Sequence, residues 1–291
     1  MSKSQTASLV PRLRCGFTIL ELILSVAIIA LLAGLLLPAL SLVKRSGQKT
    51  RELSAARQLM VAYSAYAYDH NGVLMPGLYR RNPTLPAFDE AGNELTGPAG
   101  LLAARYPWRL APYLNYNLSG LYQDEHVLSE LQSQSLNHYW ISLVPSLGIN
   151  AVFVGGDYQD GGWADSTHVR LFGRVYLTRL SEAKHPPRLI VFASARYSGE
   201  DLPGPLPGGR PFIEGYHRVN PPYLMSREWK PRYDPQGKDN DFGFVSLRHH
   251  FREAVIGFFD GHAGTLDEAQ IQDMRHWADQ ATSPDWTIEL K

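Results

Sequence analysis

A long apolar stretch near the N-terminus is the strongest pattern in the sequence. Residues 17–43 carry a single charged side chain, Glu21, and most of the others are aliphatic. A run of this length can cross the roughly 30 Å hydrocarbon core of a bilayer as an α-helix. The pattern therefore predicts a transmembrane helix over residues 17–43.

A second helical pattern follows the apolar stretch and is amphipathic. Its apolar positions recur at helical spacing, at Leu53, Ala56, Met60, Tyr63 and Ala67. Asn71-Gly72 is a typical C-terminal stop, because both residues tolerate the left-handed conformation that ends many helices. We expect a stalk helix over residues 44–71 whose apolar face packs on a globular head, residues 72–291.

After Gly72 the pattern changes to short segments rich in branched and aromatic residues. Strands are predicted at residues 151–154, 174–177, 189–193 and 254–259. Near the C-terminus, Ile271, Met274 and Ala278 repeat at helical spacing and predict a helix over residues 267–281. The expected fold class is α+β, with the long N-terminal helix packed on an antiparallel β-sheet head.

Residues 196–241 are rich in proline and glycine. A structureless segment of this length is unusual in a compact domain. We expect an insertion, a surface arm or a disordered segment here.

Glu21 requires an explanation, because a charged side chain in the centre of a bilayer costs on the order of 3 kcal/mol and usually has a partner. The residues before it, 1–16, form a short leader that contains Lys3, Arg12 and Arg14 but no acidic residue. This leader ends at a glycine that directly precedes the apolar helix. The arrangement resembles the processing and assembly site of type IV prepilins and type II secretion pseudopilins.

The resemblance implies a processing reaction and an assembly contact. Residues 1–16 would be a leader peptide that a prepilin peptidase removes by cleavage after Gly16, followed by N-methylation of Phe17. Glu21 would then neutralise the freed amino group of Phe17 on a neighbouring subunit during filament assembly.

The alternative for the N-terminus is a signal anchor that is retained and never cleaved. Basic residues flank the apolar stretch on both sides, so the positive-inside rule leaves the orientation undecided. A cytoplasmic N-terminus follows from the prepilin resemblance alone. Lipidation of Cys15 is disfavoured, because Arg14 precedes it and the apolar stretch comes after it.

A second signature lies near the C-terminus. His250 precedes an apolar segment that ends in Asp260-Gly261, a pair typical of tight hairpin turns. The spacing is similar to the "H-X9-DG" element of a large bacterial family of prepilin-like proteins. His250 and Asp260, with His249 and His262 nearby, are alternatively a catalytic pair or metal ligands, but a structural turn is the preferred interpretation.

Other segments are similar to the same family, namely residues 58–72, 106–114, 146–150 and 188–192. Two features depart from it. Ala193-Ser194 stands where the family has an acidic residue, and the cysteines that often follow the stalk helix are absent.

Composition limits the cofactors and partners. Lys+Arg and Asp+Glu number 28 each, so there is no electrostatic footprint for nucleic acid. Cys15 is the single cysteine, which leaves none after cleavage. Asp239-Asn240-Asp241 is similar to oxygen-rich calcium loops but lacks the later glutamate of an EF-hand. Calcium is thus the one cofactor left open, and a solvated turn is preferred there.

These patterns predict a structural protein and no enzyme, because no nucleophile or metal constellation is recognisable. The resemblance implies a minor subunit of a type IV pilus-like or type II secretion pseudopilus filament. It would be a single-pass protein of the bacterial inner membrane, with its head in the periplasm or on an extracellular filament. Its partners would be prepilin peptidase, other pilin subunits, an assembly platform protein and a cytoplasmic ATPase. The alternative is a membrane-anchored protein that never polymerises and whose head binds polysaccharide or another envelope protein.

Overall fold

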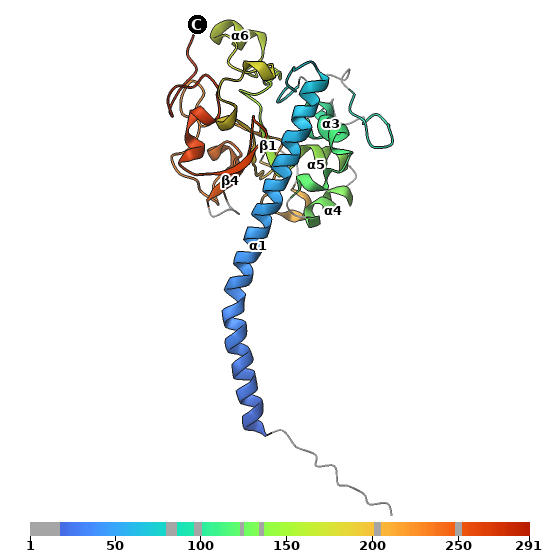
Figure 1. Ribbon diagram of the computed structural model, residues 1–291, viewed down its shortest axis with the longest axis vertical. Helices are drawn as coiled ribbons and strands as arrows, with labels where there is room; N and C mark the ends of the chain where they lie inside the picture. The colour runs from blue at the N-terminus through green and yellow to red at the C-terminus, as the bar shows by residue number, and fades with distance from the viewer. Residues whose placement is uncertain are drawn as a thin grey trace, which may run out of the picture. The chain divides into compact units, whose positions relative to one another are not determined.

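The computed structural model describes residues 18–79, 86–95, 101–122, 125–133, 137–200, 205–247 and 252–291. The chain divides into two compact units, Met1–Lys44 and Arg45–Lys291. Helix α1 (Ile19–Asp69) contributes to both units and is drawn in blue in Figure 1. The long N-terminal helix is therefore confirmed.

Helix α1 has a mostly apolar surface from Ile19 to Leu32. Its large aliphatic side chains between Ile19 and Leu32 are mostly more than half exposed, and Ile19 reaches 78%. A helix that is apolar on all sides requires a protein or lipid environment to bury it. Within the part of the chain that is described, no helix combines the length and apolar character needed to cross a bilayer.

The part of α1 in the second unit packs on the head through the predicted face. Of the predicted positions, Ala56, Met60, Tyr63 and Ala67 are at most 1% exposed, and Leu53 is partly buried. Leu59, which was not among them, is fully buried as well. The helix contacts the sheet directly, since the rings of Tyr63 and Phe192 meet edge to face with centroids 5.9 Å apart. The amphipathic pattern of the stalk is thus confirmed.

The helix ends where the sequence predicts. Asn71 and Gly72 have φ angles of 54° and 78°, in the left-handed region. The Gly72 N–H donates to the Ala67 carbonyl at 2.7 Å, which is the longer bond of a Schellman motif. The chain then leaves the helix and enters the head.

The head contains a five-stranded sheet in the order β3-β1-β2-β4-β5. The strands are β1 (Leu147–Asn150), β2 (Ile190–Ser194), β3 (Arg218–Val219), β4 (Glu253–Phe258) and β5 (Ala263–Asp267). All neighbours are antiparallel except β1 and β3, which are parallel. The sheet is therefore mixed, and the expectation of a wholly antiparallel sheet is corrected at this edge.

The close approach of β3 to β1 depends on Gly148. A Cβ atom at this position would lie 2.6 Å from the carbonyl carbon and 2.7 Å from the carbonyl oxygen of Arg218. No side chain fits in that space, so a glycine is required where the parallel pair forms.

The head also contains short helices. The α-helices are α2 (Leu101–Ala104), α3 (Tyr106–Leu110), α4 (Glu125–Ser133), α5 (Asn137–Leu143) and α6 (Ser166–Phe172). The 3-10 helices are η2 (Ala111–Leu114), η3 (Leu118–Leu121), η4 (Leu180–Glu182), η5 (Pro186–Arg188), η6 (Pro207–Gly209), η7 (Asp239–Phe242), η8 (Gln270–Gln272) and η9 (Met274–His276). α3, α4 and α5 lie together in the green part of Figure 1.

The strands predicted at 189–193 and 254–259 are confirmed as β2 and β4, but two other strand predictions are wrong. Residues 151–154 form a turn after β1, because the Asn150 side chain ends the strand. Its Nδ2 donates to the carbonyls of Ile190 and Trp277, and its Oδ1 accepts from the Phe153 N–H. Residues 174–177 make only an isolated bridge, from Leu177 to Val154.

The helix predicted over residues 267–281 is also wrong. The segment forms the separate turns η8 and η9, because aspartate side chains bind the backbone in place of helical carbonyls. Asp267 Oδ1 accepts from two following N–H groups, and Asp273 Oδ1 accepts from the Arg275 N–H. The apolar pattern still marks burial correctly, since Ile271 and Met274 are fully buried.

Much of residues 196–200 and 205–241 is packed into the head. They supply β3 and several buried side chains, among them Tyr197, Leu206, Ile213, Tyr216, Val219, Trp229 and Tyr233. The interpretation as a surface arm or disordered segment is therefore wrong for residues 196–200 and 205–241. The aromatic residues among the prolines and glycines bury enough apolar area to hold the backbone in place.

Candidate functional site

Thr18 and Glu21 form a reciprocal cap at the start of α1. The Thr18 N–H and its Oγ1 hydroxyl each donate to Glu21 Oε2 at 2.9 Å, and the Glu21 N–H donates to Thr18 Oγ1 at 3.2 Å. This is a capping box, which satisfies backbone donors at the helix N-terminus. The spacing Thr-x-x-Glu is a known sequence signal for such a box, and it could have indicated the role of Thr18.

The residues predicted for processing, Gly16 and Phe17, lie outside the described residues. Phe17 directly precedes Thr18, so cleavage after Gly16 would create an amino group four residues before Glu21 in the chain. Both Thr18 and Glu21 are exposed, which leaves the carboxylate accessible to a cation. A carboxylate in this place is favoured by the helix dipole and attracts an ammonium group.

The Asp260-Gly261 pair closes the β4–β5 hairpin. The Gly261 N–H donates to the Phe258 carbonyl at 2.9 Å, and the Phe258 N–H donates to the His262 carbonyl at 2.9 Å. Gly261 has a φ of 95°, the positive value that the end of a three-residue hairpin loop requires. The preferred interpretation of Asp260 and Gly261 as a tight turn is confirmed.

The contacts of the Asp260 carboxylate belong to the same turn. Its Oδ1 accepts from the His262 N–H at 3.1 Å and lies 2.5 Å from His262 Nδ1, while the His262 ring stacks on Phe258. Partial burial acts to raise the pKa of Asp260, but the side-chain and backbone hydrogen bonds of His262 hold it below its ordinary value. His249 and His250 lie outside the described residues. Among the residues described, no group of three or more His, Cys, Asp or Glu side chains is placed to hold a metal ion.

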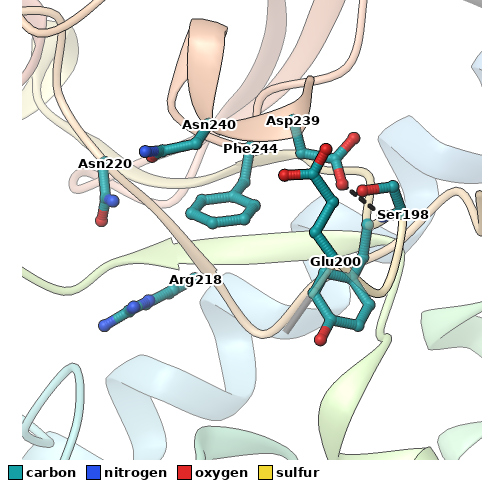
Figure 2. A pocket seen from close by; sticks show the side chains of 8 residues that line it. Ser198, Glu200, Arg218, Asn220, Asp239, Asn240 and Phe244 are labelled. Atoms are coloured by element: carbon teal, nitrogen blue, oxygen red, sulfur yellow. Dashed lines mark hydrogen bonds between the residues drawn. The ribbon is translucent and has the colours of Figure 1, made fainter. Parts of the chain in front are cut away.

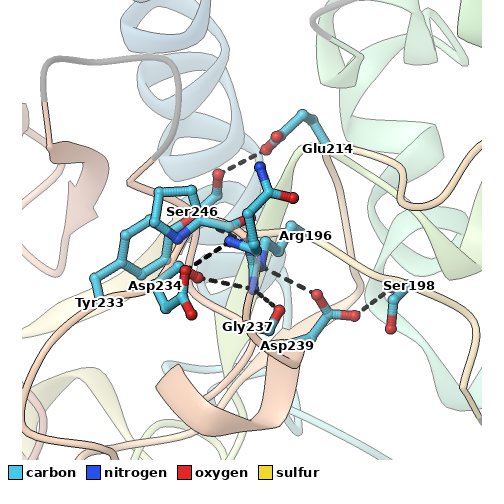
Figure 3. Close-up of polar contacts among 10 residues, drawn as sticks. Arg196, Ser198, Glu214, Tyr233, Asp234, Gly237, Asp239 and Ser246 are labelled. Carbon is cyan, nitrogen blue, oxygen red and sulfur yellow. Dashed lines mark hydrogen bonds and ion pairs between the residues drawn. The ribbon is translucent and has the colours of Figure 1, made fainter.

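A buried ion pair joins Arg196, two residues after β2, to Asp239 in η7. Arg196 Nε lies 3.0 Å from Asp239 Oδ1, and the two side chains are 2% and 5% exposed. The guanidinium also donates to the carbonyl of Pro235 at 2.9 Å. It donates to the carbonyl of Gly237 at 2.6 Å as well, as Figure 3 shows. Burial raises the pKa of Asp239, and hydrogen bonds from Ser198 together with the Arg196 charge oppose this shift. The pair fastens the loop before η7 to the sheet.

The calcium hypothesis concerned Asp239-Asn240-Asp241, which lie in η7. Asp239 is bonded to Arg196 and Ser198, and Asp241 Oδ2 accepts from Lys230 Nζ at 2.6 Å. Each aspartate thus already has a cationic side chain as its partner. The sequence pattern for calcium did not reveal these partners, because Arg196 and Lys230 are far from η7 along the chain.

Comparison with known proteins bears on the N-terminus. A family model described as "Prokaryotic N-terminal methylation motif" matches residues 11–37, which include Gly16, Phe17 and Glu21. No curated protein and no solved structure matches the chain. The match supports a type IV pilin-like precursor with a membrane-anchored N-terminus. It also supports processing of this precursor by prepilin peptidase and its assembly with pilin subunits.

Proposed function

We propose that the protein is a minor structural subunit of a type IV pilus-like or type II secretion pseudopilus filament. The observation that carries this proposal is the methylation motif at residues 11–37, which overlaps the start of the long helix α1, where the side chains from Ile19 to Leu32 form a mostly apolar surface. The proposed role requires neither a catalytic group nor a cofactor of the protein's own. The chain would be inserted in the inner membrane and then drawn into the filament by a platform protein and a cytoplasmic ATPase.

The apolar surface of α1 supplies the cohesion between subunits. Side chains such as Leu20 and Leu31, which are 76% and 66% exposed in the single chain, become buried when helices pack side by side. Each square ångström of apolar surface removed from water contributes about 25 cal/mol. A helical bundle inside a filament therefore buries what the isolated subunit leaves exposed.

Glu21 provides the specificity of the contact. Its carboxylate lies in the first turn of α1 and would bind the methylated amino group of Phe17 on the adjacent subunit. Such a pair gains strength in an apolar surrounding, because opposite charges are poorly screened there. The pairing fixes the axial register of one helix against the next, whereas apolar contact alone does not.

The C-terminal element has a structural role in this proposal. Asp260 and Gly261 shape the β4–β5 hairpin, and His250 belongs to the same proposed family motif. We assign the element to the stability of the head and give it no part in chemistry.

Two measurements test the proposed function. Mass spectrometry of the native protein should find a chain that begins at N-methylated Phe17. If the purified product still carries residues 1–16 although a matching peptidase is active, the proposal fails and a retained anchor is favoured.

Variants at the cap separate the charge of Glu21 from its hydrogen bonds. Glu21→Val removes both, Glu21→Gln keeps a side chain that a capping box accepts but removes the charge, and Thr18→Ala removes the cap alone. We expect both Glu21 variants to remain in the membrane fraction and to be lost from sheared filaments, while Thr18→Ala is incorporated. If Glu21→Gln were incorporated into filaments as well as the wild type is, the charge of Glu21 would not be required for assembly.

A further inference from the structure

A cavity of about 400 Å³ opens beside β3 in the head. Its walls come from three segments, residues 197–200 after β2, residues 218–220 and residues 239–244, and include Ser198, Glu200, Arg218, Asn220, Asn240 and Phe244 (Figure 2). The volume lies within the range of small-ligand sites, which is roughly 300–1,000 Å³. None of the residues predicted for processing or assembly lines it.

Phe244 lines this cavity and has a strained backbone conformation. Its φ is 64°, which is rare for a bulky residue. Two backbone hydrogen bonds hold it there, since its N–H donates to the Asp239 carbonyl and its carbonyl accepts from the Arg196 N–H, both at 2.9 Å. The ring remains partly exposed at the cavity, packed on Tyr216 with centroids 4.5 Å apart. Strain of this kind is concentrated at functional sites.

The polar side chains around the ring supply both donors and acceptors. Arg218 only donates, an ionised Glu200 only accepts, and the amides of Asn220 and Asn240 do both. In Figure 2 these four side chains surround the ring of Phe244. Hydroxyl groups match such a mixed set because each hydroxyl donates and accepts. A phosphate needs donors alone, and an ammonium group needs acceptors alone.

The charges at the cavity are close to balance. Asp239 is paired with Arg196, and Glu200 Oε2 lies 3.4 Å from Lys238 Nζ. Arg218 Nη1 lies 3.8 Å from Asp157 Oδ2. A neutral ligand is therefore favoured over a strongly anionic or cationic one.

Contacts within the head hold the walls of the cavity in place. The buried Arg196–Asp239 pair anchors η7, and the Tyr197 ring stacks on Tyr216 with centroids 4.6 Å apart and an interplanar angle of 13°. Tyr197 is also bridged to Ile213 by two backbone hydrogen bonds. A preformed site avoids most of the ordering cost of binding.

We propose that this cavity binds one neutral pyranose unit of a polysaccharide. A pyranose has an apolar C–H face that stacks on an aromatic ring and a rim of hydroxyl groups that both donate and accept. Phe244 provides the ring, while Asn220, Asn240, Glu200 and Arg218 provide the partners for the hydroxyls. This binding activity goes beyond filament assembly and would exist in the head whether or not the chain polymerises.

The test uses the full-length chain in a detergent without a sugar headgroup, because glycosidic detergents would compete. Saturation-transfer NMR and titration are carried out with neutral trisaccharides of glucose, mannose, galactose and xylose, and with trigalacturonate and inorganic phosphate as anionic probes. We expect at least one neutral trisaccharide to bind in the millimolar range. The anionic probes should show no binding.

Two variants locate the site. Asn240→Ala should weaken binding about fivefold, as loss of one hydrogen bond predicts. Phe244→Ala should weaken it more, since stacking is lost. Gln132→Ala, which removes an exposed amide from α4, is the matched control and should bind like the wild type. If circular dichroism shows that Phe244→Ala does not fold, Asn240→Ala alone tests the location of the site. This variant is expected to fold, because the Asn240 side chain is exposed.

Three outcomes would overturn the proposal. The first is that none of the neutral trisaccharides binds at millimolar concentration. The second is that only the anionic probes bind. The third is that binding is unchanged in Asn240→Ala, or falls equally in Gln132→Ala, which would place any binding elsewhere.

Discussion

Asp239 and Asp241 offer a direct comparison of a buried and an exposed ion pair within one short segment. Asp239 pairs with Arg196, and both side chains are at most 5% exposed. Asp241 pairs with Lys230, whose side chain is 62% exposed. The same substitution, aspartate to asparagine, removes one negative charge in each case and changes the side-chain volume very little.

The expected costs differ because burial differs. Asp239→Asn leaves the Arg196 guanidinium buried without a counter-charge, a change that costs about 3–5 kcal/mol in other proteins. Arg196 keeps its bonds to the carbonyls of Pro235 and Gly237, so we expect about 3 kcal/mol, the lower end of that range. Asp241→Asn breaks a pair that water screens, and it should cost at most about 1 kcal/mol.

Urea unfolding of the full-length chain in detergent, followed by tryptophan fluorescence, measures both costs. Trp229 is a suitable reporter, because its ring packs on Phe242 of η7 with centroids 4.2 Å apart. The slope of the transition must be the same in both variants for the free energies of unfolding to be comparable. A loss below about 1 kcal/mol in Asp239→Asn, or equal losses in the two variants, would refute the reasoning from burial.

Two further predictions concern the sheet edge and the C-terminal turns. Gly148→Ala should destabilise the head by up to about 3 kcal/mol, because its Cβ would overlap the β3 backbone. Gly264→Ala, whose nearest neighbour would be at 3.4 Å, should change the free energy of unfolding by less than about 0.5 kcal/mol, and equal losses would contradict the argument. The side-chain hydrogen bond from Arg275 is the main cause that lowers the pKa of Asp273 below 3.8. Its stabilising effect is therefore complete above pH 3.8 and is lost as the pH falls through the lowered folded value. Asp273→Asn should thus be less stable than the wild type at pH 7 and equally stable once the pH is below both values, and an acid titration of the unfolding midpoint in which the gap persists would contradict this.

The apolar pattern predicted buried positions correctly where burial depends on the position of a residue within a single helix or strand. The stalk positions Ala56, Met60 and Tyr63 are buried as their spacing predicts, and Asn71-Gly72 ends α1. β2 and β4 were found because they are central strands and read as continuous apolar runs. The processing motif was recognisable because its residues are adjacent in the chain.

Errors arose where side chains compete with the backbone for hydrogen bonds. Asn150 ends β1 early by bonding to Ile190 and Trp277, so the apolar residues that follow form a turn. Asp267 and Asp273 divide the C-terminal segment into two 3-10 turns, although its apolar residues are spaced as in a helix. The Asn150 bonds reach carbonyls that are distant in the chain, and the spacing of apolar residues does not reveal them. The aspartate bonds are local, to N–H groups two or three residues on, but apolar spacing takes no account of polar side chains.

The sequence by itself determined the features of the N-terminal region. These are an apolar helix with a carboxylate near its start, a glycine before that helix, and an amphipathic continuation after it. These features follow from neighbours along one helix, where spacing and position coincide. Only the tertiary structure decided the parallel edge at β3, the buried Arg196–Asp239 pair and the cavity around Phe244. Each of these joins residues far apart in the chain, and their contacts arise because the packed sheet brings distant segments within hydrogen-bond distance.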